Sequence, residues 1–446
     1  MRLARISHTC TAAAADAVAV ARRTLSRRLD VVSATPSPSL DPCGAPQRRL
    51  DALATRQREK SGLARTLLAL AFSFAAACAA AQSPGVSDDE IAVGSIQDLS
   101  GPIAMLGSPI RDGMLMRFEE ANAQGGIHGR RLRLVVEDAG YDPKRAVLAA
   151  RKLIQRDQVF AFLANLGTPV VMATMPMVVE AGRPHLFPFS PHQSTYTPLH
   201  PLKFQMFAPY QDYMDAAVRH MMSTGGYARA CLLYQDDDYG LEVMKGVEAG
   251  LSGLGAALVE KTSYKRGATD LSSQIARLRA ADCDLVVLAT VVRETVAAMA
   301  EARKQGWMVD MLVTASGYSA QTHELGGPAV EGLFGVTVLP HPYREGASPE
   351  LADWIERYRA RFGAPPNVWS AMGYTVADLF VRAAESAGRE LTVETFVSAM
   401  ESLHTGRDIF GGPEYRFTVD DHLGNRLGRL ARIRDGRWEI VTDYLE

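Results

Sequence analysis

Short apolar runs rich in β-branched residues alternate along the chain with longer stretches whose apolar residues recur every three to four positions. The short runs have the length of buried strands, and the longer stretches have the period of an α-helix. This alternation predicts parallel sheets with right-handed crossovers and helices on both faces. The runs that predict strands are 91–96, 132–137, 159–164, 185–189, 230–234, 257–263, 285–289, 311–314 and 332–338.

The ends of several helices can also be recognised. Ser108 is a favourable N-cap with Pro109 at the first helical position, and the glycine pair at 125–126 ends the same helix. Near the end of the chain, the Asp-Gly pair at 435–436 predicts a tight hairpin. Other helices are expected at 144–155, 241–254, 349–361, 369–387 and 392–402.

The pattern divides into two halves. It restarts after a proline-containing break at 207–210, and the chain is too long for a single sheet. We therefore predict an α/β fold with two doubly wound parallel-sheet lobes. The first lobe is expected to comprise residues 88–208 and 339–405, and the second lobe residues 209–338 and 406–446.

Composition and charge narrow the classes of function. The chain has 446 residues, of which 47% are apolar and 22% charged, as in soluble globular proteins. Its 48 basic and 50 acidic residues are unevenly placed, because residues 1–65 hold 12 of the basic and only 5 of the acidic ones. The remainder therefore carries a net charge of −9, which argues against a nucleic-acid partner.

The basic leader runs directly into an uncharged apolar segment. Four Lys or Arg residues lie in 56–65, and the segment 66–81 has no charge and ends in three alanines. This order indicates a signal peptide over 56–81 that is cleaved near Ala81, and hence a periplasmic protein. Cys78 permits a second interpretation, a lipoprotein signal that retains Cys78 as a lipid anchor.

Residues 1–55 have no apolar period, so we expect a disordered leader, and a misassigned start codon is our hypothesis for its presence. After cleavage only Cys231 and Cys283 remain, each at the entrance of a predicted strand. We expect two small buried thiols there rather than a disulfide. No Cys and His cluster has the spacing of metal ligands, so we expect neither a metal nor a cofactor.

Ligands of open α/β sheets bind beyond the carboxyl ends of strands, so the residues that follow each strand are the candidates for a site. In the segment 165–170, Gly167 allows a close backbone approach, Thr168 is the expected N-cap and Pro169 opens a helix. Such a helix start offers free N–H groups to an anion, and we expect a carboxylate there. An ordinary capped helix without a ligand has the same sequence, so the motif alone leaves both interpretations open.

Hydroxyl and aromatic side chains follow three further strands. Tyr239, within an acidic run at 236–240, offers both an aromatic face and a hydroxyl, and Tyr318, shortly after Ser316, is expected where the lobes face each other. The loop at 190–196 and the acidic run also suit ordinary solvated surface. The loop residues that can hydrogen-bond a polar head group are Ser190, Gln193, Ser194 and Thr195.

The chain has no recognisable catalytic constellation. Its histidines are scattered and no nucleophile, base and orienting acid recur together. The loop at 95–107 contains glycine but lacks both the G-x-G-x-x-G pattern and a Walker A lysine. We therefore expect a binding protein without catalytic residues rather than an enzyme.

Five segments are distinctive in their order and spacing. They are IAVGSIQDLSGP at 91–102, EEANAQGGIHG at 119–129, EDAGYDP at 137–143, YQDDDYG at 234–240 and TDLSSQIARLR at 269–279. In them, the chain from about Asp88 to Leu445 resembles the extracytoplasmic solute-binding proteins of branched-chain amino acid ABC importers, which have the type I periplasmic binding protein fold. The resemblance implies two lobes joined by a hinge of three crossovers, closing over a ligand as a hinged trap. It also implies that Thr168 and the 190–195 loop hold the ligand carboxylate while Tyr239 closes from the other lobe.

The chain departs from the amino acid binders of that family where they place an acidic residue for the ligand ammonium. The corresponding segment 315–318 reads Ala-Ser-Gly-Tyr. Leu106 replaces an aromatic residue of many relatives, and Val291 lies where they have polar or aromatic side chains, although Arg293 or Glu294 could reach in. Because a buried ammonium without a counter-charge is costly, we predict a carboxylate ligand with an apolar or aromatic body.

The expected function is therefore that of a monomeric solute-binding protein that delivers such a ligand to the membrane permease of an ABC importer. A ligand-sensing regulatory domain of the same fold is the alternative. A neighbouring gene for a permease or for a receptor kinase would distinguish the two.

Overall fold

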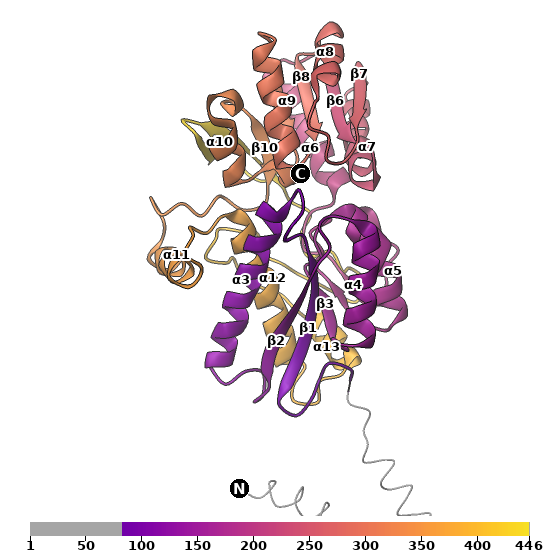
Figure 1. Ribbon diagram of the computed structural model, residues 1–446, viewed down its shortest axis with the longest axis vertical. Helices are drawn as coiled ribbons and strands as arrows, with labels where there is room; N and C mark the ends of the chain where they lie inside the picture. The colour runs from indigo at the N-terminus through magenta and orange to yellow at the C-terminus, as the bar shows by residue number, and fades with distance from the viewer. Residues whose placement is uncertain (1–82, 446) are drawn as a thin grey trace, which may run out of the picture. The chain divides into compact units, whose positions relative to one another are not determined.

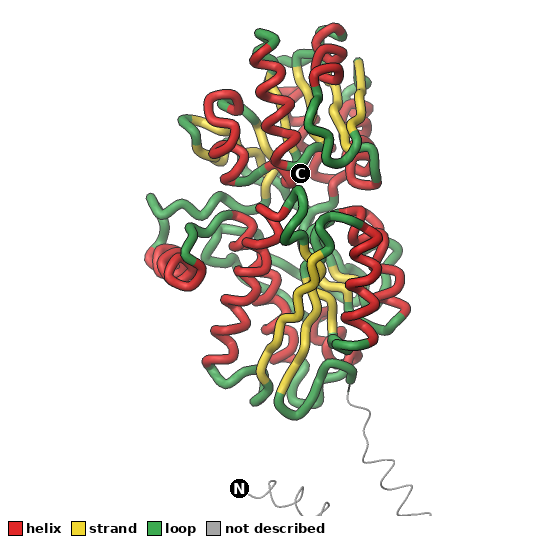
Figure 2. Tube along the Cα trace, in the orientation of Figure 1, coloured by secondary structure: helices red, strands yellow, loops and turns green. Residues whose placement is uncertain are grey.

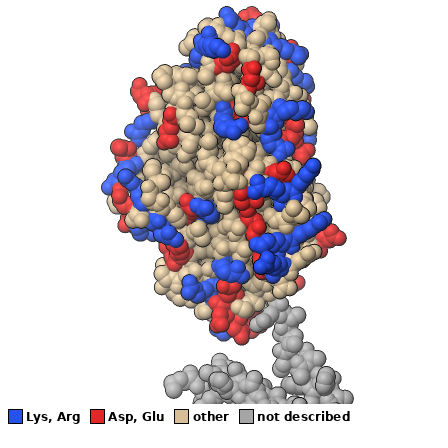
Figure 3. Space-filling view, viewed as in Figure 1, with Lys and Arg blue, Asp and Glu red and all other residues tan. Residues whose placement is uncertain are grey.

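The computed structural model describes residues 83–445, which lie in one compact unit and form two α/β lobes (Figure 1, Figure 2). The expected leader and signal peptide lie outside the described residues. Within the described range, no helix has both the length and the apolar character needed to span a membrane. On the face shown in Figure 3, positive and negative side chains are interspersed over both lobes.

The first lobe is built on a sheet that is parallel throughout, in the order β2-β1-β3-β4-β5. Its inner strands β1 and β3 are buried almost without a break, as expected for a parallel sheet with helices on both faces. The strands are β1 (Glu90–Gln97), β2 (Arg131–Asp138), β3 (Ala161–Leu163), β4 (His185–Leu186) and β5 (Lys203–Phe204).

Helices cover both faces of this sheet (Figure 1). Helices α3 (Ala104–Ala123) and α12 (Val368–Ser386) pack against each other on one side, and α4 (Pro143–Gln155) and α5 (Thr168–Glu180) pack together on the other. Two more helices join the first pair: α11 (Pro349–Phe362) contacts α3, and α13 (Val393–Glu401) contacts α12.

The second lobe has a mixed sheet in the order β12-β11-β10-β9-β8-β6-β7. Only β11 and β12 run antiparallel to their neighbours, and they form the hairpin that the Asp-Gly pair predicts. The strands are β6 (Ala230–Gln235), β7 (Glu260–Tyr264), β8 (Leu285–Ala289), β9 (Asp310–Val313), β10 (Phe334–Thr337), β11 (Arg429–Arg434) and β12 (Arg437–Ile440).

On this second sheet, α6 and α7 pack together, and α9 packs against both α8 and α10. The helices are α6 (Tyr210–Gly225), α7 (Asp238–Gly253), α8 (Ser272–Ala280), α9 (Val292–Lys304) and α10 (Ala320–Gly326). Short 3₁₀ turns occur at η1 (Gln193–Thr195), η2 (Ala315–Gly317) and η3 (Gly327–Val330).

The chain passes between the lobes three times, between β5 and α6, after β10, and before β11. The expected start of the last second-lobe segment at residue 406 is too early. Phe417 still packs on Phe187 and Phe204 of the first lobe, with ring centroids 5.6 and 5.9 Å apart, and Leu423 pairs with Gln205. The third crossover therefore lies at 426–428, because the aromatic tail completes the first core before the chain leaves it.

The helix expected to start at Ser108 begins one turn earlier, at Ala104. The carboxylate of Asp98 accepts hydrogen bonds from the amides of Gly101 and Ile103, so the loop ends there and Pro109 falls inside the helix.

The structure also corrects the expectation of two free thiols. Cys231 of β6 and Cys283, just before β8, form a disulfide with their Cα atoms 5.9 Å apart. The two neighbouring parallel strands bring together cysteines that are 52 residues apart in the sequence, which a strand-by-strand interpretation does not reveal. Disulfides of this kind are typical of proteins that fold in an oxidising compartment.

Candidate functional site

Two adjacent cavities lie where the lobes meet. The first, which we call the Thr168 pocket, has an empty volume of about 310 Å³, and the second, the hinge chamber, one of about 490 Å³. The Thr168 pocket is lined by Ile103, Leu106, Tyr141, Leu166, Gly167, Thr168, Phe189, Tyr210, Tyr239, Val291, Ser316 and Trp369. The hinge chamber is lined by Phe189, Pro191, Phe207, Ala208, Tyr210, Tyr213, Ala315, Ser316, Val336, Thr337, Val338, Trp369, Met372 and Gly428.

The first wall of the Thr168 pocket is the start of α5. The expected N-cap, Thr168, is the first residue of the helix, and Gly167 is the N-cap. The backbone of Gly167 has a φ of 94°, in the region that favours glycine. A Cβ atom at Gly167 would lie 2.5 Å from the ring of Tyr141. Among the described residues, no protein acceptor receives the amides of Thr168 or Val170, and Pro169 has no N–H. The helix start therefore keeps two amides for another acceptor.

The hydroxyl of Thr168 is held in place by two neighbours. The Ser190 hydroxyl donates to Thr168 Oγ1 at 3.0 Å, and the Tyr210 hydroxyl lies 3.4 Å from the same atom. Ser190 is fully buried and is not among the residues that line either cavity. Ser190 therefore positions Thr168 from behind, while Tyr210 reaches it from the first residue of α6 in the second lobe.

The opposite wall carries a second tyrosine. The hydroxyl of Tyr239 lies 2.6 Å from Thr314 Oγ1 and 3.2 Å from the carbonyl oxygen of Thr290, and its ring centroid lies 5.2 Å from that of Tyr210. Burial raises the pKa of Tyr210 to about 12 and raises the pKa of Tyr239 further. Both side chains are therefore neutral at physiological pH. The Tyr210 hydroxyl can donate to an anion without adding charge, whereas the Tyr239 hydroxyl already donates to the Thr290 carbonyl.

The residues that line the two cavities include no Asp, Glu, Lys, Arg or His. Glu294, which could have supplied a carboxylate, lines neither cavity and is buried in the first turn of α9, where desolvation raises its pKa. The cleft therefore has no counter-charge for an ammonium group.

Polar contacts join the lobes on one side of the cleft. The Tyr141 hydroxyl accepts a hydrogen bond from Gln235 Nε2 at 3.1 Å, and the Tyr141 carbonyl accepts one from Arg266 at 2.7 Å. The Arg266 guanidinium also lies 5.2 Å from the centre of the Tyr141 ring. Tyr141 thus closes the Thr168 pocket and anchors the second lobe at the same time.

Six of the ligand-binding residues predicted from the sequence line the Thr168 pocket: Leu106, Gly167, Thr168, Tyr239, Val291 and Ser316. Three other residues predicted from the sequence line neither cavity and make hydrogen bonds in and around the 190–195 loop instead. The Gln193 amide donates to Glu242, the Ser194 carbonyl accepts from Lys203, and the Thr195 hydroxyl donates to the His192 carbonyl.

Tyr318, which the sequence also predicts as a ligand-binding residue, lines neither cavity. It packs on Trp438 with ring centroids 4.7 Å apart, on the side of β10 that carries the hairpin. The physical reason is the short turn η2, in which Thr314 accepts a hydrogen bond from the Ser316 amide and turns Ser316, not Tyr318, toward the cleft.

Sequence reasoning misses four aromatic walls of the site. Tyr141 lies in the EDAGYDP segment, Tyr210 is the last residue of the break at 207–210, and Phe189 and Trp369 lie at the ends of predicted elements. An aromatic residue at the end of an element is a usable signal, but it does not tell a cleft wall from a core residue until the lobes are placed.

The chain is similar in sequence to known binding proteins. A family model described as "Periplasmic binding protein" matches residues 90–437. Among curated proteins, "Leu/Ile/Val-binding protein homolog 7" of Brucella abortus (strain 2308) is 25% identical over 401 residues, covering 83% of this chain and 94% of the relative.

Solved structures give the same picture. A fatty acid ABC transporter substrate-binding protein from Thermomonospora curvata aligns with a TM-score of 0.73 and 26% identity, covering 81% of this chain and 94% of its own. An ABC transporter solute-binding protein from R. palustris, solved with benzoate, aligns with a TM-score of 0.71 and 17% identity over 80% of this chain and 96% of its own, which shows a common fold.

Proposed function

Because the chain belongs to the periplasmic binding protein family, as an extracytoplasmic solute-binding protein of the kind that serves branched-chain amino acid ABC importers, we propose that it captures an organic acid with an apolar body. In this proposal the carboxylate is held in the Thr168 pocket, and the loaded protein delivers the acid to the importer's membrane permease. Its relatives are substrate-binding proteins of ABC transporters.

One observation supports this proposal: two amides without an acceptor in the described part of the chain lie at the start of α5, where Gly167 and Thr168 line a cleft that has no charged side chain. The amides of Thr168 and Val170 have no acceptor among the described residues, and the hydroxyls of Thr168 and Tyr210 lie beside them. The positive end of the α5 dipole adds to the attraction for an anion. A carboxylate supplies acceptors that these donors lack.

The remaining walls favour an apolar body and disfavour an amino acid. Leu106, Val291 and Phe189 line the pocket, and no carboxylate lies there to pair with an ammonium. Burying an unpaired ammonium costs several kcal/mol, which exceeds the gain from a few apolar contacts. The substrate-binding protein from T. curvata supports an acid of this kind, since it serves a fatty acid ABC transporter and a fatty acid carries a carboxylate and no amine.

The proposal is tested with matched pairs of ligands that differ only in the ammonium group. We expect 4-methylpentanoic acid to bind more tightly than leucine, and 3-phenylpropanoic acid more tightly than phenylalanine, in isothermal titration calorimetry of protein that has been unfolded and refolded to remove bound ligand. The primary amides of both acids should bind weakly. Tight binding of the amino acids with no binding of the acids would overturn the proposal.

The same proposal places the mature protein outside the cytoplasm. Membership of the family supports that location, and the buried disulfide between Cys231 and Cys283 is of the kind that forms in oxidising compartments. We propose that the apolar segment at 66–81 is the export signal, with cleavage near Ala81 or retention of a lipidated Cys78.

A further inference from the structure

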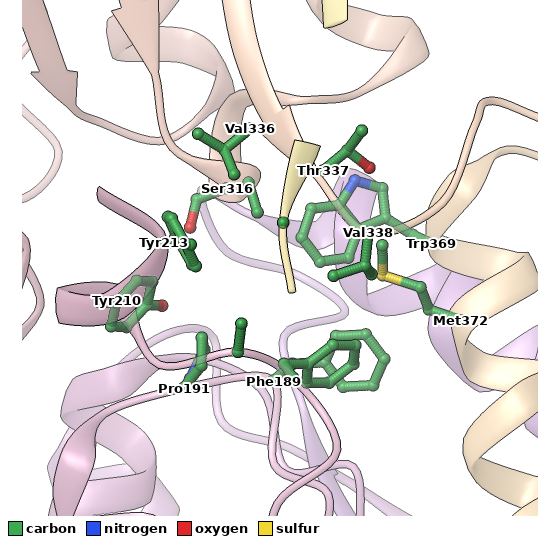
Figure 4. Close-up of a pocket in the computed structure, with 14 residues that line it drawn as sticks. Phe189, Pro191, Tyr210, Tyr213, Ser316, Val336, Thr337, Val338, Trp369 and Met372 are labelled. Carbon is green, nitrogen blue, oxygen red and sulfur yellow. The ribbon is translucent and has the colours of Figure 1, made fainter. Parts of the chain in front are cut away.

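Tyr141 borders two hollows at once. It lines the Thr168 pocket, and it also lines a groove at the rim of the cleft that has an empty volume of about 1030 Å³. Among the described residues, Tyr141 is the one that the pocket and this rim groove share. The hinge chamber, whose lining residues are drawn in Figure 4, shares no residue with the groove. Tyr141 therefore stands between the Thr168 pocket and the rim.

The rim groove is a charged edge of the cleft that is open to solvent. Its walls include exposed charged side chains of both lobes, Asp142 and Lys144 from the first and Asp236 and Lys265 from the second. The Thr168 pocket, by contrast, has no charged side chain in its lining. The residue between the two hollows therefore separates an apolar site from a solvated edge.

The backbone of Tyr141 has a conformation that favours glycine. Gly140 and Tyr141 form a tight turn with φ angles of 56° and 58°, and the Asp142 amide donates to the Ala139 carbonyl across it at 3.0 Å. Positive φ angles are costly for a residue with a side chain, and Gly, Asn and Asp are the usual residues in such turns. A tyrosine at this position indicates a side chain whose contacts outweigh the strain.

Within the first lobe, the ring of Tyr141 covers the start of α5. A Cβ atom at Gly167 would lie 2.5 Å from Tyr141 Cε2, and Tyr141 itself is only 4% exposed. The ring therefore lies against the turn that leads to Thr168 and Val170, whose amides have no protein acceptor in the described structure. In this position the ring shields the start of the helix from the rim groove.

Three residues of the second lobe hold Tyr141 from the other side. We call Gln235, Asp237 and Arg266 the Tyr141 clamp. Gln235 Nε2 donates to the Tyr141 hydroxyl at 3.1 Å, and Arg266 donates to the Tyr141 carbonyl at 2.7 Å. The guanidinium of Arg266 also lies 5.2 Å from the centre of the Tyr141 ring, within the range of a cation–π contact. The clamp thus engages the backbone, the ring and the hydroxyl of one residue.

Asp237 organises the clamp within the second lobe. Its carboxylate accepts a hydrogen bond from Gln235 Nε2 at 2.7 Å, lies 3.6 Å from Arg266 Nε and caps α7 through the Tyr239 amide. Because Gln235 Nε2 donates to a carboxylate, the orientation of its amide is fixed, and its second N–H faces the Tyr141 hydroxyl. The clamp is therefore arranged by contacts inside one lobe, and only Tyr141 comes from the other.

From these contacts we infer that Tyr141 is a gate of the Thr168 pocket and that Gln235, Asp237 and Arg266 hold it shut, so that they set the rate at which a bound molecule leaves. The three are positioning residues, because they line neither the Thr168 pocket nor the hinge chamber. Their contacts with Tyr141 join the two lobes, so they must break when the lobes open and are absent when a ligand enters. The inference rests on the proposed function only in placing the ligand in the Thr168 pocket, and it holds for any chemical class of ligand.

Stopped-flow tryptophan fluorescence tests the gate, with whichever of 4-methylpentanoic acid and leucine the wild type binds. Arg266→Gln removes the charge and the reach to the Tyr141 carbonyl. We expect dissociation to become roughly three- to tenfold faster, the effect of one partly exposed charged hydrogen bond, while the association rate stays unchanged. Arg266→Lys keeps the charge and should lie between wild type and Arg266→Gln. A fall in the association rate in place of faster dissociation would contradict the gate.

Two further variants probe the clamp at other atoms. Asp237→Asn keeps a cap for α7 but loses one acceptor oxygen, and Tyr141→Phe keeps the ring and the carbonyl but loses the hydroxyl. Both should release the ligand faster than the wild type. The controls are Arg277→Gln and Tyr227→Phe, which remove contacts to Glu260 and Asp310 inside the second lobe and should not change the kinetics. Wild-type dissociation rates in both Arg266→Gln and Asp237→Asn would overturn the inference.

Hydrogen–deuterium exchange of the ligand-free protein tests the gate without a ligand. Thr168 and Val170 are each 1% exposed, so their amides exchange only when the structure around them opens. We expect the peptide 165–171 to exchange several-fold faster in Arg266→Gln than in the wild type or Arg277→Gln, while β8 exchanges equally in all three. Equal exchange of the peptide 165–171 in all three proteins would also overturn the inference.

The two measurements separate the failure of the gate from that of the proposed function. If leucine binds and 4-methylpentanoic acid does not, the proposed ligand class is wrong, and the kinetics with leucine still decide on the gate. If neither compound binds, exchange alone decides on it. If the acid binds as proposed while the clamp variants release it at the wild-type rate, the gate is wrong and the proposed function stands.

Discussion

His192 Nε2 in the first lobe lies 3.4 Å from Glu242 Oε2 in the second lobe, so that the two side chains join the lobes at one rim of the cleft. His192 Nδ1 accepts a hydrogen bond from the Ser194 amide, which leaves Nε2 as the protonated nitrogen that faces Glu242. Glu242 also accepts from the Gln193 amide at 3.0 Å and pairs with Lys245.

This contact predicts that ligand binding weakens in mild acid. Burial lowers the pKa of His192, with Glu242 and Asp238 opposing that shift and Lys245 adding to it. Burial alone would raise the pKa of Glu242, but the Gln193 amide, His192 and Lys245 together hold it below its usual value, so Glu242 stays ionised. A histidine whose pKa is lowered in the closed form takes up protons more readily when the lobes separate, so acid favours opening.

We therefore expect the ligand dissociation constant to rise as the pH falls through the ordinary histidine range of about 6.5. The His192→Gln variant keeps an N–H donor toward Glu242 but does not titrate, so its affinity should change less over pH 7.5 to 5.5. His220→Gln, on α6, is the control and should keep the wild-type slope. If the dissociation constant of His192→Gln changes with pH as steeply as that of the wild type, a group other than His192 causes the pH dependence.

Thr168→Val tests the carboxylate contact directly. The variant keeps the shape of the side chain but removes the hydroxyl that Ser190 and Tyr210 orient. We expect acids to bind more weakly by about 1 to 3 kcal/mol, the cost of losing a hydrogen bond to a charged group. Thr262→Val, at another buried threonine that lines neither cavity, should leave binding unchanged. Equal affinities of wild type and Thr168→Val would show that the hydroxyl does not contact the acid.

Ser316→Asp should shift the specificity toward amino acids. Ser316 lines both cavities. It belongs to the segment 315–318, where the resemblance implies an acidic residue in the amino acid binders of this family. A carboxylate there supplies the missing partner for an ammonium and repels an anion, and like charges in a closed interface cost several kcal/mol. We expect calorimetry to show loss of 4-methylpentanoic acid binding and gain of leucine binding. The control is Ser316→Asn, because Asn has the shape of Asp without its charge. We expect this variant to bind 4-methylpentanoic acid more tightly than Ser316→Asp does and to show no binding of leucine.

The disulfide between Cys231 and Cys283 should contribute measurably to stability. It closes a loop between cysteines 52 residues apart, and a bridge of this kind stabilises by about 2–4 kcal/mol, chiefly by restricting the unfolded chain. The double variant C231S/C283S should therefore unfold at lower urea concentration, and reductant should destabilise the wild type but not the variant. Two free thiols in unfolded, unreduced protein would contradict the bridge.

The proposed export signal predicts the mass of the mature protein. Cleavage after Ala81 leaves Gln82 as the first residue, whereas a lipid anchor leaves an acylated Cys78. Intact mass spectrometry of protein from the periplasm and from the membrane fraction distinguishes these forms. Under simple cleavage, Cys78→Ser should change neither the mass of the mature chain nor its location. A peptide from residues 2–50 in the exported protein would contradict both forms.

The chain order alone determines the architecture of each lobe. Buried strands such as β1 and β8 are short apolar runs, and helices such as α4 show a clear apolar face, so local periodicity suffices to predict an α/β fold. The same local signals identify the loop at Gly167 and Thr168, because a glycine, a small hydroxyl residue and a proline in succession are typical of the start of a helix.

Only the tertiary structure decides what faces the cleft. The disulfide, the third crossover at 426–428 and the joint wall of Tyr210 and Trp369 all bring together residues that are far apart in the chain. Ser316 rather than Tyr318 lines the cleft because of the single short turn η2, and the residue types alone do not determine the direction of that turn. Side-chain direction and long-range pairing are set by packing over the whole core, and no local pattern in the sequence records them.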